Sequence, residues 1–227
     1  MNTIPIRFGG HDLLLDSDGA VFWPAQRLLA VADLHLEKGT AAASKGSLLP
    51  PWDTKITLDR VETLLVRYRP ATVVALGDSF HDRYGFSRMA PADAGRLLAW
   101  VEHIDFVWVL GNHDPAPAPG LAGLSTLCWS HLGLDFCHQA RTGASQPELV
   151  GHHHPKATVP TRAGHVTRPC FVVDEHRLML PAIGAFTGGL DVANPAIARL
   201  FPVGGRAYLL GRNRLFSFPL HHVAETA

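Results

Sequence analysis

Cysteine is scarce in this sequence of 227 residues, which contains only Cys128, Cys137 and Cys170 and no CxxC pair. An odd and sparse set excludes a disulfide framework and the spacing of a zinc ribbon. We therefore expect the three cysteines to be small apolar core residues, and we expect the protein to work in a reducing compartment.

An excess of charge of one sign is also missing. The 20 Lys and Arg residues balance the 20 Asp and Glu residues, so the formal net charge is zero. Net charge therefore gives no support for binding to nucleic acid or to a membrane surface.

Long hydrophobic runs are absent as well. The apolar runs, such as 28–32 and 72–76, have the length of a strand and fall far short of the ~18 residues of a spanning helix. The N-terminal residues lack the basic and apolar regions of a signal peptide. We expect a cytoplasmic protein without membrane contact.

The composition otherwise favours a folded enzyme-sized domain. Hydrophobic residues make up 47% of the chain, which is enough to bury a core, and the length fits a single domain over residues 1–227. The unusual feature is the 14 histidines. Because imidazole is the commonest metal ligand among side chains, this count points first to a metal site.

Periodicity predicts a strand-and-helix alternation in the first half and a strand-rich second half. Helices are expected over 53–68 and 91–103, and 40–52 is expected to be a loop. The predicted strands are 4–8, 12–16, 20–23, 28–32, 72–76, 106–110, 126–129, 132–137, 148–150, 170–173, 177–180, 206–210 and 215–218. This order indicates an α/β (α+β) fold of packed sheets flanked by helices.

Side chains that can bind a metal ion come directly after five of the predicted strands. They are Asp33 and His35, then Asp78, then Asn112 with His113 and Asp114, then His138, and finally His152 and His154. Loops at the carboxyl ends of strands converge on one crevice in open α/β sheets. We therefore expect these residues to meet although they span roughly 120 positions of the chain.

The local spacing also suits metal binding. A period of two turns both side chains of Asp33-x-His35 to one side, and likewise those of His152-x-His154, so that His153 points away. Glycines precede Asp78, Asn112 and His152, where we expect them to let the backbone turn beside an ion. Carboxylate, imidazole and amide ligands suit Mn²⁺, Fe²⁺ or Zn²⁺. Seven candidates suffice for two sites that share a carboxylate.

The ordered series D-x-H, G-D, G-N-H-D, H and G-H-x-H resembles the calcineurin-like metallophosphoesterases. The resemblance runs from Asp33 to His154 and implies an αββα sandwich of two packed mixed sheets flanked by helices. It also implies that one ion is held by Asp33, His35 and His154, that a second is held by Asn112, His138 and His152, and that Asp78 bridges both.

The resemblance implies a chemistry too. A binuclear-metal-dependent phosphodiesterase would attack phosphorus with a metal-bridging hydroxide. His113 would be the general acid for the leaving oxygen, and Asp114 would orient His113. Mn²⁺ is the expected metal, with Fe²⁺, Zn²⁺, Ni²⁺ and Co²⁺ as alternatives.

A narrower resemblance covers most of the chain. The stretches VADLHLEKGTAAASKGSLLPPWDT, LGDSFHD and LPAIGAFTGGLDV are similar to the bacterial ligase-associated DNA damage response endonucleases, the PdeM group. This similarity implies a phosphodiester substrate in DNA, a role in DNA repair, and a DNA ligase, a helicase and a nuclease as partners. Two alternatives stay open: a phosphoesterase or pyrophosphatase acting on a small nucleotide or nucleotide-lipid, and an inactive scaffold of the same fold.

Several residues keep two interpretations at this stage. His131 competes with His138 as a ligand. One interpretation of His81 and Asp82 is that they contact substrate. The alternative for Asp82 is that it caps the following segment. Trp52 stacks on a base or packs in the core. Lys38 contacts phosphate or is a solvated charge. Gly188 and Gly189, in the sequence Phe186-Thr187-Gly188-Gly189, allow a close backbone approach to the active site or form a plain turn.

Overall fold

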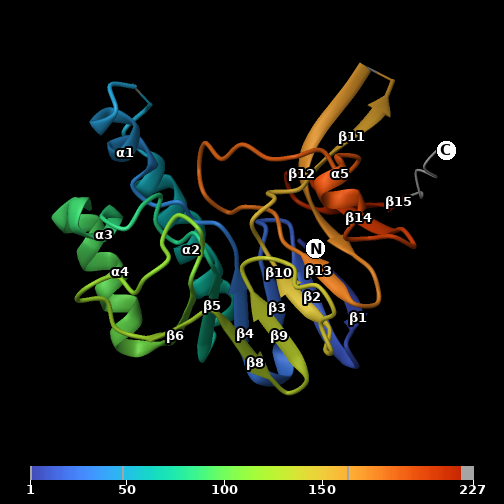
Figure 1. Cartoon of the computed structure of the whole chain (residues 1–227), viewed down its shortest axis with the longest axis horizontal. Helices are drawn as coiled ribbons and strands as arrows, with labels where there is room; N and C mark the ends of the chain where they lie inside the picture. Colours follow the sequence, from blue (N-terminus) through green and yellow to red (C-terminus); the bar gives the residue numbers. More distant parts are fainter. Residues whose placement is uncertain (1, 48, 163, 221–227) are drawn as a thin grey trace.

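Two β-sheets packed face to face form the centre of the protein (Figure 1). The computed structural model describes residues 2–47, 49–162 and 164–220. The first sheet has seven strands in the order β1-β2-β3-β4-β5-β6-β7. Their bounds are β1 Thr3–Phe8, β2 His11–Asp16, β3 Val21–Trp23, β4 Leu28–Val31, β5 Thr72–Leu76, β6 Asp105–Val109 and β7 Leu124–Thr126.

The second sheet has eight strands in the order β15-β14-β12-β13-β10-β9-β8, with β11 paired to β12. Their bounds are β8 Cys128–His131, β9 Leu134–Cys137, β10 Glu148–Val150, β11 Lys156–Thr161, β12 Gly164–Val173, β13 Arg177–Met179, β14 Gly205–Leu210 and β15 Leu215–Leu220. Both sheets mix parallel and antiparallel pairs.

Helices cover the outer faces unequally. Four of them lie together on the side of the seven-stranded sheet (Figure 1): α1 Lys38–Ser44, α2 Asp53–Tyr68, α3 Gly85–Arg88 and α4 Pro91–His103. The outer face of the second sheet carries the short α5, Pro195–Ala198, whose Ile197 packs with Val150 and Val172. A single-turn 3₁₀ helix, Pro24–Gln26, precedes β4. The predicted sandwich of two mixed sheets with flanking helices is confirmed.

The central strands are buried on both faces, which explains their continuous apolar runs. In β4, Leu28 and Ala30 pack into the core between the sheets, whereas Leu29 and Val31 pack against the helical layer. All four side chains are at most 2% exposed. Burial of alternate residues in two different cores fixes the register of the strand, because a slip by one residue would exchange the two faces.

The strands that lead to the candidate residues end at one shared edge. In the first sheet β4, β5 and β6 run parallel, and in the second sheet β9 and β10 run parallel. A parallel bridge between Ala32, just after β4, and Ala182, just after β13, joins the two sheets at this edge. The loops after five strands are therefore brought together.

Residues 40–52 are not a loop throughout, and that prediction is wrong, since α1 occupies Lys38–Ser44. The alanine-rich segment favours a helix, and tertiary contacts hold its first turn: the N–H of Gly39 donates to Asp53 and the hydroxyl of Thr40 donates to Glu37. The hairpin of β11 with the first half of β12 and the helices α3 and α5 were not predicted. Helices α2 and α4 have the predicted bounds.

The expectation that all three cysteines stay unpaired is also corrected. Cys128 on β8 and Cys137 on β9 are direct cross-strand partners and form a disulfide. Sequence spacing did not reveal the pairing, because it depends on the register of a hairpin. Cys170 is a free, buried core residue, as predicted.

Within the described ranges, no helix is both long and apolar enough to cross a membrane. The assignment of residues 1–227 to a single domain stays a prediction.

A buried ion network supports the strand β10 that leads into the GHHH segment. Glu148 is fully buried and accepts hydrogen bonds from the guanidinium of Arg177 and from the backbone N–H of Arg141. Breaking a buried pair by removing one partner leaves the other charge uncompensated.

We predict that Glu148→Ala lowers the free energy of unfolding by about 3–5 kcal/mol, because Arg177 would lose its buried partner. Urea denaturation measures this change. Asp12→Ala is the matched control, since the Arg7–Asp12 pair is exposed on both sides and should cost less than about 1 kcal/mol. Equal losses in the two variants would contradict the assignment.

Candidate metal centre

Six of the seven predicted ligands form two compact groups at the shared edge. In the first group, Asp33, His35 and His154 place one ligand atom each within 4.8 Å of the others. Nε2 of His35 lies 3.2 Å from Nε2 of His154, which lies 3.5 Å from Oδ1 of Asp33.

The second group has the same construction. Asp78, His138 and His152 place their ligand atoms within 4.8 Å of one another. Nε2 of His138 lies 3.2 Å from Nδ1 of His152 and 3.0 Å from Oδ1 of Asn112, so the amide oxygen of Asn112 joins this group. The structure thus brings all seven predicted residues together.

Asp78 belongs to the second group and also approaches the first. Its Oδ2 is 3.3 Å from Nε2 of His138 and 3.9 Å from Nε2 of His35. Its Oδ1 accepts a hydrogen bond from the backbone N–H of His113. One carboxylate therefore reaches ligand atoms of both groups, which is the geometry that a shared bridge requires.

Backbone strain is concentrated in these residues. Ten non-glycine residues have a positive φ within the described part of the chain, and half of them are candidate ligands. Their φ values are 54° for Asp33, 45° for His35, 46° for Asp78, 72° for His152 and 47° for His154. Such conformations cost free energy and persist where the surrounding structure demands them, commonly at functional sites.

The glycines ahead of three ligands act mainly by making room. A Cβ on Gly111 would lie 2.1 Å from Oδ1 of Asp78, and a Cβ on Gly151 would lie 2.6 Å from Oδ2 of Asp33. Of these three glycines, only Gly77, with φ of 78°, also has the left-handed backbone that favours glycine. Gly111 and Gly151 instead allow two loops to approach a buried carboxylate closely.

Electrostatics divide the histidines into neutral and charged ones. Burial and the neighbouring His154 lower the pKa of His35 to about 3, and burial with His138 lowers the pKa of His152 to about 4. Burial alone would lower the pKa of His138, but its hydrogen bond to Asp78 and the charge of Asp33 raise it to about 9.

This donor set fits divalent metal ions. At neutral pH His35 and His152 offer lone pairs, and burial of the Asp33 and Asp78 carboxylates leaves them dependent on nearby positive charge. Two imidazole nitrogens 3.2 Å apart, as in His35 and His154, repel unless a proton or a cation lies near both. A metal at each group would meet both requirements.

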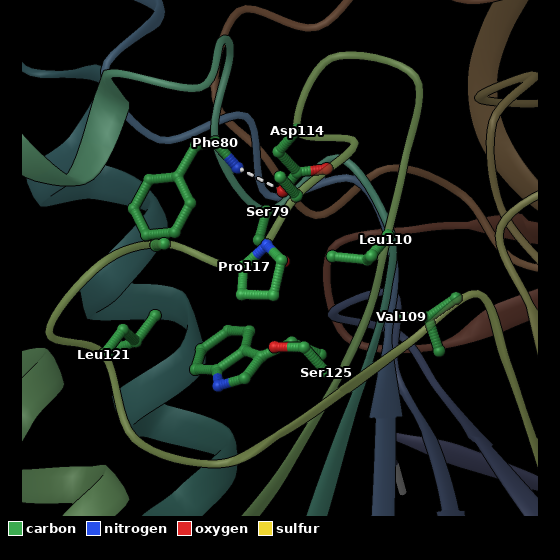
Figure 2. A pocket seen from close by; sticks show the side chains of 11 residues that line it. Ser79, Phe80, Val109, Leu110, Asp114, Pro117, Leu121 and Ser125 are labelled. Carbon is green, nitrogen blue, oxygen red and sulfur yellow. Dashed lines mark hydrogen bonds between the residues drawn. The ribbon is translucent and has the colours of Figure 1, made fainter.

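His113 and Asp114 differ from the predicted arrangement. Nδ1 of His113 lies 2.9 Å from the backbone carbonyl oxygen of His81. The carboxylate of Asp114 instead accepts from the backbone N–H groups of Gly111 and Phe80. Figure 2 shows it directed at the nitrogen of Phe80, above a small pocket. We therefore reassign the orientation of the His113 ring from Asp114 to the His81 carbonyl.

Asp114 organises loops rather than the ring of His113. Burial raises the pKa of its carboxyl to about 6. Its two backbone partners belong to the loop after β5 and the loop after β6. It therefore ties together the segments that carry Asp78 and Asn112.

His81 is a site residue that the sequence left open. Its Nδ1 lies 3.4 Å from Nδ1 of His35, and its ring centroid is 4.8 Å from that of His113. It does not follow a strand directly, so the strand-end pattern gave no signal for it. Its loop is brought to the site by pairing with the loop after β4, through a bridge between Leu36 and Phe80.

The structure also places the other residues for which the sequence left two interpretations. Asp82 accepts from the N–H of Tyr84 and forms a bidentate pair with Arg88, so its role is structural. His131 lies beside Gln26, outside both groups, whereas His138 lies within the second. His153 also lies outside both groups. Trp52 is 61% exposed and is not a core residue.

Two packed mixed sheets with carboxylate–imidazole groups at their shared edge define a metal-dependent phosphoesterase. Comparison with protein families matches residues 26–169, which include every candidate ligand, to the calcineurin-like phosphoesterases. The chain belongs to this family and is a hydrolase of ester bonds. Members of the family use divalent metals.

One solved structure supports the same assignment. The crystal structure of the Pseudomonas putida nuclease MPE is similar at 33% identity, covers 96% of this chain and 100% of its own, and gives a TM-score of 0.73. This similarity is consistent with the resemblance to the PdeM group. Yfce, a phosphoesterase from E. coli, covers 86% of this chain and 99% of its own at 14% identity and a TM-score of 0.44. No curated protein matches significantly.

We predict that Gly111→Ala weakens metal binding, because its Cβ would lie 2.1 Å from Oδ1 of Asp78 and displace the carboxylate. Bound manganese, measured by elemental analysis after dialysis, should fall to less than half of its normal content. Gly95→Ala on α4 is the control, since a Cβ there meets nothing within 4 Å. It should keep the metal and unfold at slightly higher urea. Normal metal content in Gly111→Ala would contradict the close packing inferred here.

Proposed function

We propose that this chain hydrolyses phosphodiester bonds with two divalent metal ions held at the two groups. Asp33, His35 and His154 would hold one ion, and Asn112, His138 and His152 would hold the other. The observation that carries the proposal is the position of Asp78, whose Oδ2 lies 3.3 Å from His138 Nε2 and 3.9 Å from His35 Nε2. We propose Asp78 as the bridge.

The proposed reaction needs an activated water and a proton for the leaving oxygen. When bound, two divalent ions supply an activated water and stabilise charge on the attacking and leaving oxygens. His113, with Nδ1 against the His81 carbonyl, keeps Nε2 available to hold the proton that the leaving oxygen needs. Imidazole titrates near neutral pH, which suits a general acid.

We propose a nucleic-acid substrate, most specifically DNA. The similar Pseudomonas putida protein is a nuclease, and the sequence resembles DNA damage response endonucleases. The same resemblance supports Mn²⁺ as the metal, a cytoplasmic role in DNA repair, and a DNA ligase, a helicase and a nuclease as partners. An inactive scaffold is disfavoured because every expected ligand and His113 lie together at the edge of the sheets.

Hydrolysis of bis(p-nitrophenyl) phosphate tests the activity. Protein stripped with a chelator should be inactive, and added Mn²⁺ should restore turnover. We predict that Asp78→Ala loses at least one bound ion and reduces turnover at least 100-fold, because both groups lose a shared ligand. Asp59→Ala, which changes an exposed carboxylate on α2, should behave as the unchanged protein.

Two outcomes would count against the proposal. Folded protein that shows no turnover with Mn²⁺, Ni²⁺, Co²⁺ or Zn²⁺ would contradict a phosphodiesterase of this kind. Normal metal stoichiometry in Asp78→Ala would contradict the bridge. Turnover much faster on a small nucleotide than on any DNA would favour the nucleotide phosphoesterase instead.

We predict that His113→Ala keeps both metals and slows hydrolysis according to the leaving group. Diesters with an alcohol leaving group should slow by about 10²–10⁴-fold, because the alkoxide needs a proton. Diesters of p-nitrophenol should change little, since that anion leaves unprotonated. The comparison requires kcat for both esters and a metal analysis of the variant. An equal loss on both esters would show that His113 is not the general acid.

A further inference from the structure

The connection between β13 and α5 runs along the first ligand group. Figure 1 shows it crossing from the second sheet toward the helical side. At one end the N–H of Gly184 donates to the carbonyl of Asp33 at 3.1 Å, and further on the N–H of Leu190 donates to the carbonyl of His153 at 3.2 Å. The segment between these bonds therefore spans from one ligand loop to another.

Of the two adjacent glycines in this segment, Gly189 makes a close approach to a ligand loop, whereas a Cβ on Gly188 would meet nothing within 4 Å. A Cβ on Gly189 would lie 2.2 Å from the carbonyl oxygen of His154. The helices hold the other part of the segment: the hydroxyl of Thr57 on α2 accepts from the N–H of Ala185, and Lys38 on α1 donates to the carbonyl of Phe186 at 3.0 Å. The position of Phe186 is thus fixed from both sides.

Phe186 combines two unfavourable features. Its side chain is 46% exposed although it is large and apolar. Its φ is 56°, in the left-handed region that bulky residues avoid. Strain of this kind, together with an exposed aromatic ring, is typical of residues that contact a ligand.

Two lysines lie along the backbone of this segment. Nζ of Lys38 is bonded to the Phe186 carbonyl and keeps further protons to donate. Lys156 starts β11, and its Cε lies 3.0 Å from the position of a Cβ on Gly189. Burial lowers the pKa of Lys38, the charge of Asp53 opposes this shift, and the charge of Lys156 adds to it. An exposed aromatic ring on a segment that two lysines approach matches a base and its flanking phosphates.

We propose that Phe186 stacks on an unpaired base of single-stranded nucleic acid next to the hydrolysed phosphodiester, while Lys38 and Lys156 contact neighbouring phosphates. This inference rests on the proposed function and assigns the residue that selects a nucleic-acid strand over a simple diester.

The test compares two substrates in one variant. Phe186→Gly removes the ring and accepts the positive φ, so it should fold normally. We predict that kcat/KM for a single-stranded oligothymidylate falls roughly 5- to 150-fold, the loss expected for one stacked base. Turnover of bis(p-nitrophenyl) phosphate should stay unchanged. Phe186→Trp, which keeps an aromatic face, should restore oligonucleotide cleavage.

A binding measurement separates failure of this inference from failure of the proposed function. Fluorescence anisotropy of labelled oligothymidylate with chelator-stripped protein should show the same 5- to 150-fold loss in Phe186→Gly, even if no substrate turns over. Phe216→Ala is the control, because Phe216 is 41% exposed on β15. Unchanged affinity in Phe186→Gly would overturn the inference. In the turnover assay, an equal loss on oligothymidylate and on bis(p-nitrophenyl) phosphate would also overturn the inference, because the ring would then have a structural role.

Discussion

Burial of two carboxylates at the edge where both sheets end is the constraint on which the site depends. Asp33 and Asp78 are at most 2% exposed, and an uncompensated buried charge is costly. Backbone N–H groups of His152 and His113 donate to them, and imidazoles surround them. The loops must therefore approach closely, which explains why glycine stands at positions 111 and 151 and why ligand backbones are strained.

The same constraint links stability to function. Each sheet contributes parallel strands whose ends carry ligands, so neither sheet forms the site alone. The buried pair of Glu148 and Arg177 stabilises β10 just ahead of the His152 loop, and Asp114 ties the loops after β5 and β6. These polar contacts do no chemistry, yet they hold in place the loops that carry the candidate ligands.

How well the sequence predicts a feature depends on how far apart in the chain the interacting residues lie. The strand-end rule predicted that the seven candidate ligands meet, because it needs only a buried strand and the residue after it. The sequence did not predict the partners of Asp114, the Cys128–Cys137 disulfide or helix α1. Each depends on how close separate segments of the chain lie in the folded structure. His81 and Phe186 follow no strand directly. Their positions come from backbone pairing with the Asp33 loop and from contacts with α1 and α2.

The most direct test of the central claim is a crystal structure of the manganese-loaded protein with anomalous diffraction at the manganese edge. We predict two anomalous peaks, one at Asp33, His35 and His154 and one at Asn112, His138 and His152, with an Asp78 oxygen bound to both. A single peak, or two peaks of which only one contacts Asp78, would contradict a bridged two-metal centre.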